Sequence, residues 1–307
     1  MNKLVKAYIS IIFSMAFFAF SYVWFKVANE AYRPITIVFF RLAISVVLLS
    51  LFLLITGRFE KIRKEDRKYF FLIATFEPFL YFIFESHGLT YVSSTVASVI
   101  VSTIPVFTAI GALIIFKEKL SRFNYLGVVV SFTGILIFIV AGKSNLSFDI
   151  RGIILMFCAV LCATGYSLLL RKLAFNYRPV YIVNVQNIIG LVLYLPVFII
   201  SEGKYIPEMK PDGDALVAVV QLAIFGSCGA FILFGYTVRV IGVTRANLFA
   251  NIIPVLTAVF AFYSIGEIIT IEKFVGIIIM ISGLYMAQIR KKTRSKGGGT
   301  VPGGFPD

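Results

Sequence analysis

Three ionisable residues stand inside long apolar stretches of this chain: Arg41, Glu77 and Glu85. If such a stretch crosses a bilayer, a charged group within it is costly unless it faces water or a partner, so it is a functional candidate. Glu77 is the deeper of the two acids and precedes Pro78, whose ring weakens the helix where the carboxylate is attached. The pattern predicts a charge or proton relay built from these three groups.

Two chemistries stay open for Glu77. A carboxyl group in a low-dielectric site can exchange a proton near neutral pH. Alternatively, Arg41, one predicted span earlier, neutralises Glu77, and the ion pair braces two helices. The substitution Glu77→Gln separates these hypotheses. It removes proton exchange without loss of stability in the first case, and it destabilises the protein by about 3 to 5 kcal/mol in the second.

A solute site is predicted from polar side chains that recur on particular apolar stretches. Any single one is also explained by a hydrogen bond between helices, but together they indicate a wet interior. Trp24 fits lipid contact as well as a cavity wall. The predicted substrate-binding residues are Ser21, Tyr22, Trp24, Ser98, Ser102, Tyr166, Asn184, Asn187, Asn247 and Asn251.

Pro105 and Pro254 interrupt two of the apolar stretches. A proline inside a helix removes a backbone hydrogen bond, and in a bilayer the freed carbonyl needs a partner in the protein or in a water-filled cavity. We therefore predict helix kinks at both prolines and one cavity between them, although a kink that serves packing alone remains open. Asn247 and Asn251 are four residues apart, so they are expected on one helix face and in that cavity.

No catalytic constellation is found in the sequence. There is no HExxH motif, no Ser and His pair within the spans and no acidic metal cluster, and His87, the single histidine, lies beside a predicted span end. Cys158, Cys162 and Cys228 all fall in apolar runs and are predicted to be packing residues. We expect no enzyme activity, no metal and no cofactor.

The elements that must position these residues are membrane spans. The chain is 59% hydrophobic and 14% charged, and runs of the roughly 20 apolar residues that a span needs recur throughout. The net charge of +14 comes from Lys and Arg between the runs, which indicates topology and not a nucleic-acid partner. Ten spans are predicted at residues 7–27, 35–55, 69–86, 92–116, 123–141, 152–170, 180–200, 215–236, 246–265 and 274–289.

The distribution of charge between spans predicts the orientation. Most Lys and Arg residues lie on the side of the N-terminus, which places both termini in the cytoplasm of a multi-pass protein of the cell membrane. Residues 293–307 are rich in glycine and have no apolar periodicity, so this tail is expected to be disordered.

The chain contains an internal repeat. A shift of 149 residues aligns Tyr91–Leu136 with Val240–Tyr285 without a gap. A shift of 145 residues aligns the triplets 32–34 and 177–179, both Tyr-Arg-Pro. Five spans per half is an odd number, so the second half enters the membrane from the other side, as in many secondary transporters. The identical pairs include Pro105/Pro254, Glu118/Glu267, Gly127/Gly276 and Gly134/Gly283.

The repeated segments resemble a known family. Residues 88–137, and their counterpart at residues 240–286, resemble the signature of the drug/metabolite transporter superfamily, EamA type. The resemblance implies ten helices around a central cavity, with the fifth and tenth helices at the periphery. It also implies small substrates such as amino acids, their derivatives, drugs and other metabolites.

Together these observations predict an all-α membrane protein of ten transmembrane helices, arranged as two inverted five-helix repeats around a central cavity. The repeats are expected at residues 1–145 and 146–292. The predicted function is secondary transport, the export or exchange of a small amphipathic metabolite such as an amino acid by alternating access, with proton coupling to be tested. A channel, a lipid scramblase and an intramembrane enzyme are the alternatives. The expected partners are the solute and membrane lipid, for a monomer or a homodimer, and the sequence leaves the substrate and the direction of transport open.

Overall fold

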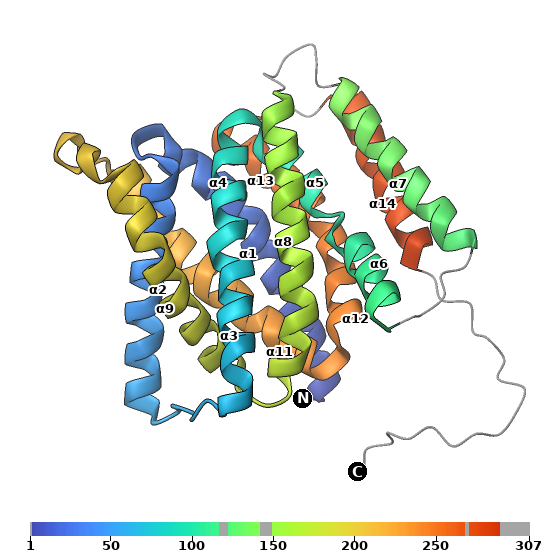
Figure 1. The fold of residues 1–307 in the computed structure, drawn as a ribbon. Coiled ribbons are helices and arrows are strands. Elements are labelled where there is room, and N and C mark those ends of the chain that lie inside the picture. The colour runs from blue at the N-terminus through green and yellow to red at the C-terminus, as the bar shows by residue number, and fades with distance from the viewer. Residues whose placement is uncertain (1, 117–121, 142–148, 268–269, 289–307) are drawn as a thin grey trace, which may run out of the picture.

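The computed structural model describes residues 2–116, 122–141, 149–267 and 270–288, and all regular structure in these ranges is helical (Figure 1). In chain order the elements are α1 (Lys3–Ala31), α2 (Pro34–Thr56), η1 (Lys64–Asp66), α3 (Arg67–Ala74), η2 (Thr75–Leu80), α4 (Tyr81–Tyr91), α5 (Ser94–Val101), α6 (Ile104–Phe116), α7 (Arg122–Ala141), α8 (Ile150–Ala174), α9 (Pro179–Ser201), η4 (Gly203–Glu208), α10 (Gly213–Gln221), η5 (Leu222–Ala230), α11 (Phe231–Ile241), α12 (Val243–Leu248), η6 (Phe249–Ile252), α13 (Ile253–Ile265) and α14 (Ile271–Gln288).

These elements form ten helical passes. Within the described ranges, eight passes are long and apolar enough to cross a membrane, and α7 and α14 complete the set. Large apolar side chains cover the outside of the bundle, for example Ile55 at 85% and Ile200 at 81% exposure. An apolar surface that covers most of a protein is unfavourable in water, so the passes lie in lipid. The fold is therefore that of a multi-pass α-helical membrane protein, as predicted.

The turns between passes follow local sequence signals. Pro34 and Pro179 each lie in the first turn of a helix, where the missing N–H has no helical partner to lose. Gly57 and Gly266 end α2 and α13 in the left-handed conformation, with φ of 62° and 66°. We call the side on which α1 begins the N-face, and the other side the opposite face.

Four passes are interrupted, and the interruptions recur in the two halves. The third pass is broken within η2, and the eighth contains the wide helical turn η5. The fourth pass breaks between α5 and α6, just before Pro105. The ninth breaks at η6, just before Pro254. The repeated prolines thus stand in the first turn of the second segment of each pass, where a proline costs the helix no hydrogen bond.

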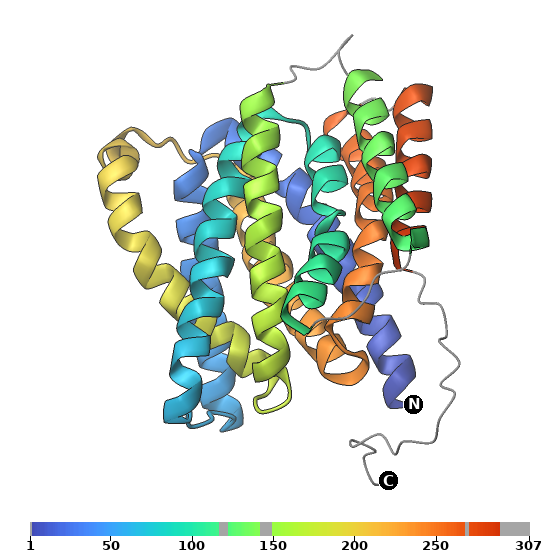
Figure 2. The ribbon, with the colours of Figure 1, turned by 45° about the vertical axis from the view of Figure 1, so that its right-hand side comes forward.

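Two helices lie apart from the rest. Figures 1 and 2 both show α7 and α14 side by side at the edge of the bundle, where the resemblance places the fifth and tenth helices. Their contact is made by glycines: a methyl group on Gly134 would clash with the backbone of Met280, and one on Gly283 would clash with the backbone of Ser131. The shift of 149 residues converts the first pair of residues into the second.

This exchange of partners reveals the symmetry. Exchanging the two halves converts the Gly134–Met280 contact into the Gly283–Ser131 contact between the same two helices. This equivalence requires a two-fold axis between α7 and α14. The residue numbers also run in opposite directions along α7 and α14, so the helices are antiparallel and the axis is perpendicular to them. An axis perpendicular to membrane-spanning helices lies in the membrane plane, and the two repeats are therefore inverted.

Candidate functional site

A central cavity of about 60 Å³ lies between the two repeats. Its walls come from passes one, three and four of the first half and from passes six, eight and nine of the second, which are equivalent passes. Among the described residues, none from passes two, five, seven or ten lines it. Ile104 and Ile253, the residues directly before the two repeated prolines, both line it, so the helix breaks border the cavity from opposite halves.

The cavity is small in this conformation. A water molecule occupies about 30 Å³ of liquid, and pockets for small molecules usually measure about 300 to 1,000 Å³. A cavity of about 60 Å³ therefore has room for water but not for a metabolite. A solute could be held here only after the walls move apart.

Glu77 lines the cavity from the break in the third pass. Its backbone leaves the helical region, with φ −150° and ψ 117°, and the Glu77–Pro78 peptide bond is cis. Gly190 of α9 lies against the Pro78 ring, where a larger residue would clash. The Glu77 side chain is only 6% exposed, and no ion pair within 4.0 Å joins it to Arg41 or to another cation in the described part of the chain.

A hydrogen-bonded chain runs from the cavity toward the opposite face. The hydroxyl groups of Tyr22 and Tyr81 lie 3.3 Å apart and both residues line the cavity. Tyr81 also donates a hydrogen bond of 2.7 Å to the half-buried carboxylate of Glu85. Tyr81 is four residues from both Glu77 and Glu85, and this spacing is the signal in the sequence that could have identified it.

Arg41 does not line the cavity, and its side chain contacts residues outside the wall. Its Nε donates to Ser227 Oγ at 2.9 Å, and its guanidinium carbon lies 4.2 Å from the centre of the Phe82 ring. The structure thus places the three predicted relay residues in one region but puts only Glu77 in the cavity.

The predicted solute-binding residues separate into two groups. Tyr22, Tyr166 and Asn247 line the cavity. The serines do not line it, and each donates to a carbonyl of its own pass: Ser21 to Phe17, Ser98 to Thr95 and Ser102 to Val99, at 2.8, 2.8 and 2.7 Å. Trp24 also lies outside the cavity wall, stacked on Phe20 with 5.1 Å between ring centres.

Two asparagines of the seventh pass form hydrogen bonds with the second pass. Asn184 accepts from Ser50 at 3.1 Å, and Asn187 donates to Ser45 at 2.7 Å. Both asparagines are buried away from the cavity. Helices α2 and α9 pack against each other, so these polar groups serve as interhelical hydrogen bonds.

Asn247 and Asn251 do not share the cavity. Asn247 lines it and donates to Thr108 Oγ1 at 3.2 Å. Asn251 lies outside the wall, and its buried amide oxygen has no hydrogen-bond partner in the part of the chain that the structure describes. The cause is η6, which lies between them. A 3₁₀ turn has three residues per turn, so four residues no longer return to the same face.

The sequence prediction missed several wall residues. Tyr81, Ser167 and the rings of Phe18, Phe231 and Phe234 line the cavity. Aromatic residues are so frequent in this chain that their type alone does not distinguish a wall from lipid contact. Tyr81 and Ser167 carry polar groups, but they were not among the predicted substrate-binding residues.

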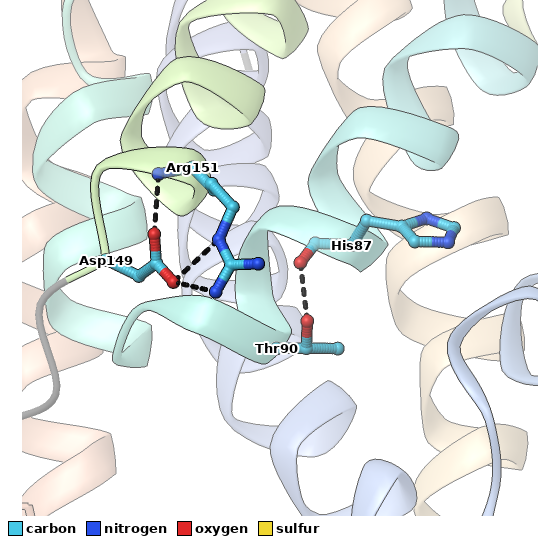
Figure 3. A network of polar contacts seen from close by, with 4 residues as sticks. All are labelled: His87, Thr90, Asp149 and Arg151. Carbon is cyan, nitrogen blue, oxygen red and sulfur yellow. Dashed lines mark hydrogen bonds and ion pairs between the residues drawn. The ribbon is translucent and has the colours of Figure 1, made fainter.

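His87 is not part of the cavity wall. It lies near the end of α4 on the opposite face, and Figure 3 shows its ring pointing away from the Asp149–Arg151 pair. Its Nδ1 lies 2.9 Å from the Ile83 carbonyl, and its own carbonyl accepts from Thr90 at 2.7 Å. Asp149 accepts from the Arg151 side chain at 2.8 Å and from its backbone N–H at 2.9 Å, and these bonds lower the pKa of Asp149.

Comparison with known proteins identifies the family of the chain and finds its two halves separately. The model of the EamA-like transporter family matches twice, at residues 5–140 and 150–288. The chain belongs to the EamA-like transporter family. The two matches correspond to the two repeats of the fold.

Relatives of similar length are known in archaea and bacteria. An uncharacterized transporter of Archaeoglobus fulgidus is 24% identical over 288 residues, covering 94% of this chain and all of the relative. The uncharacterized transporter YcxC of Bacillus subtilis is 24% identical over 301 residues, covering 95% of this chain and 96% of its own. A solved crystal structure superposes with a TM-score of 0.67 at 16% identity, over 94% of this chain and 99% of that one, and it shares the fold.

The described residues offer no metal site. No group of three or more His, Cys, Asp or Glu side chains comes together in the ranges that the structure describes. The chemistry of the cavity rests on one carboxylate, phenol and amide groups and aromatic rings.

Proposed function

We propose that this EamA-like transporter is a secondary carrier that exports or exchanges a small amphipathic solute by alternating access, driven by protons that bind Glu77. The observation that carries the proposal is a buried carboxyl group that has no ion pair among the described residues and lies in a cavity lined by three passes of each inverted repeat. Since the halves are related by a two-fold axis in the membrane plane, exchanging their conformations opens the cavity to the other face.

The small cavity volume supports a closed conformation between the two open ones. Aqueous paths to both faces at once would dissipate any gradient, so a carrier has to pass through a state of this kind. The broken helices on four of the six wall-forming passes supply places where those passes can bend. The excess of Lys and Arg on the N-face supports a cytoplasmic location for that face in the cell membrane.

Flux into sealed vesicles tests the proposal. Purified protein is reconstituted, and uptake of aromatic amino acids and amines is measured with and without an imposed pH gradient. We expect saturable uptake that the gradient accelerates. Glu77→Gln should retain the wild-type melting temperature and lose the acceleration, whereas Glu30→Gln, at an exposed site outside the cavity, should keep it.

Each alternative predicts a different result. A channel would give uptake that does not saturate, and a scramblase would move labelled lipid between leaflets without moving solute. If Glu77→Gln has normal stability and unchanged gradient-driven uptake, Glu77 is not the proton carrier. If it unfolds instead, Glu77 has a structural role that the described contacts do not reveal.

A further inference from the structure

We propose that the solute is an organic cation, an amine with an apolar body, and that its ammonium group binds Glu77 within a wall of aromatic rings. This inference rests on the proposed transport function and names its substrate class. Among the residues that line the cavity, Glu77 is the one that can carry a charge, and it does so once it has released its proton. A solute entering this space therefore meets a negative group and no positive one.

The nearest cations are engaged elsewhere. Arg41 uses Nε on Ser227 and places its guanidinium on the Phe82 ring, and it does not line the cavity. Lys26 donates to the carbonyl of Leu89 at the opposite face. A solute carboxylate would therefore lie near Glu77 without a counter-ion, in a site that excludes most water, and like charges under these conditions repel strongly.

The walls favour a cation. Six aromatic residues line the same cavity as Glu77: Phe18, Tyr22, Tyr81, Tyr166, Phe231 and Phe234. Phe231 is central to this group, with edge-to-face contacts to Phe18 at 5.2 Å and Tyr166 at 6.0 Å between ring centres. Aromatic faces carry partial negative charge and attract ammonium groups, most strongly where water is excluded. The same rings bind an apolar body by dispersion and burial.

Acceptors for the N–H groups are also present. Tyr166 lines the cavity, and its buried hydroxyl lies near the Gln186 side chain but makes no hydrogen bond of standard geometry among the described residues. Asn247 uses its amide nitrogen on Thr108, so its oxygen is the atom left for a ligand. Together with the Glu77 carboxylate these make three acceptors, the number that a primary ammonium with three N–H donors requires. A buried hydroxyl whose hydrogen bonds are incomplete has the capacity to bind a ligand or a water molecule.

The test uses four compounds that share one phenyl group and differ in charge: phenethylamine, phenethyl alcohol, hydrocinnamate and phenylalanine. Binding to the purified full-length protein in detergent is measured by calorimetry and by the shift in melting temperature. We expect phenethylamine to bind at least about tenfold more tightly than the alcohol, as a desolvated cation–π site and a carboxylate imply. Hydrocinnamate and phenylalanine should bind more weakly than the alcohol.

Variants locate the preference. Glu77→Gln should bring phenethylamine to the affinity of the alcohol, Glu77→Asp should retain the preference for the amine, and Glu30→Gln should match the wild type. The proposal is overturned if none of the four compounds binds, if hydrocinnamate or phenylalanine binds more tightly than the amine, or if the preference survives in Glu77→Gln. The wild-type comparison decides the question even if a variant does not fold.

Transport and substrate class can fail separately. If vesicles accumulate hydrocinnamate or phenylalanine but not phenethylamine, the substrate class is wrong and the carrier function stands. If phenethylamine binds with the expected preference and no solute moves, the carrier function is wrong and the cation site stands.

Discussion

The two Tyr-Arg-Pro turns lie on opposite faces of the molecule, and each is held by a loop of the other half. At the opposite-face turn (Tyr32–Pro34), Glu202 holds the start of α2. Its carboxylate accepts from the backbone N–H of Ile35 at 3.2 Å, and from both the N–H and the hydroxyl of Thr36 at 2.7 Å. Glu202 is 7% exposed, so this cap is almost closed to solvent.

The N-face turn (Tyr177–Pro179) is held differently. Here the buried carboxylate is Asp66, which accepts from the Tyr177 hydroxyl at 2.9 Å, while the same hydroxyl accepts from the N–H of Arg63 at 3.0 Å. The backbone N–H of Arg178 donates to the carboxylate of Glu60, at 3.2 and 3.3 Å. The side chains of Arg178 and Glu60 remain 54% and 23% exposed.

The difference shows how duplicated halves diverge. The start of a helix leaves backbone N–H groups that need acceptors, and both turns meet this need with an acid from the other half. At the opposite face that acid is buried and accepts three hydrogen bonds, two of them at 2.7 Å. At the N-face the buried acid binds the tyrosine, and the acid at the helix start is partly exposed. Bonds to a buried charge contribute more than exposed ones, so we expect the opposite-face turn to be the stronger connection between the repeats.

The largest effect is expected for Glu202→Ala. It leaves three buried donors without an acceptor, so we expect the free energy of unfolding to fall by about 3 kcal/mol. Chemical denaturation in detergent measures this change. Glu208→Ala, at an exposed position of the same loop, is the control and should change stability by less than about 0.5 kcal/mol. Equal losses in the two variants would show that the Glu202 cap is not what holds the turn.

The two tyrosines provide a matched pair. Tyr177→Phe removes a hydrogen bond to a buried carboxylate and the acceptor of the Arg63 N–H, and should cost about 1.5 kcal/mol. Tyr32→Phe removes longer contacts with the Asp212 backbone, at 3.3 and 3.4 Å, and should cost about 0.5 kcal/mol. The same denaturation experiment applies to both. A larger loss for Tyr32→Phe would mean that the Tyr32 hydroxyl contributes more to stability than the Tyr177 hydroxyl does.

A smaller effect is expected from pH. Burial raises the pKa of Tyr177, and the hydrogen bond to Asp66 raises it further. The folded state therefore keeps the phenol proton at a pH where the unfolded chain has lost it, so this contribution to stability is complete below about pH 10 and declines above it. Unfolding measured between neutral pH and about pH 11 should show a shallower alkaline decline in Tyr177→Phe than in the wild type. Parallel curves would contradict the burial of this hydroxyl.

The smallest effect is expected for Glu60→Gln. Its ion pair with Arg178 is partly exposed at 3.4 Å, and such pairs contribute about 0.5 kcal/mol or less. Added salt should reduce even this difference, because exposed charges are screened. A loss as large as that of Glu202→Ala would mean that the two faces are held equally strongly.

Properties that depend on local composition could be predicted from the sequence. The apolar runs identified the membrane passes, because the length of a span is set by bilayer thickness and not by neighbouring helices. The repeated prolines mark the breaks in the fourth and ninth passes, and the repeated glycines mark the close contact between α7 and α14. The inversion of the repeats followed from an odd number of spans per half.

The faces of the helices were decided by the tertiary structure. In the sequence, Arg41 and Glu77 look alike, because both are ionisable residues within apolar stretches. In the structure, the Arg41 guanidinium contacts Ser227 and Phe82, whereas Glu77 lines the cavity. Asn251 lies outside the cavity because a 3₁₀ segment changes the direction of the side chains that follow it. The spacing of residues in the sequence did not predict that segment. Which face of a helix lines a cavity depends on where that helix breaks and on what packs behind it, and both are set by contacts between residues far apart in the chain.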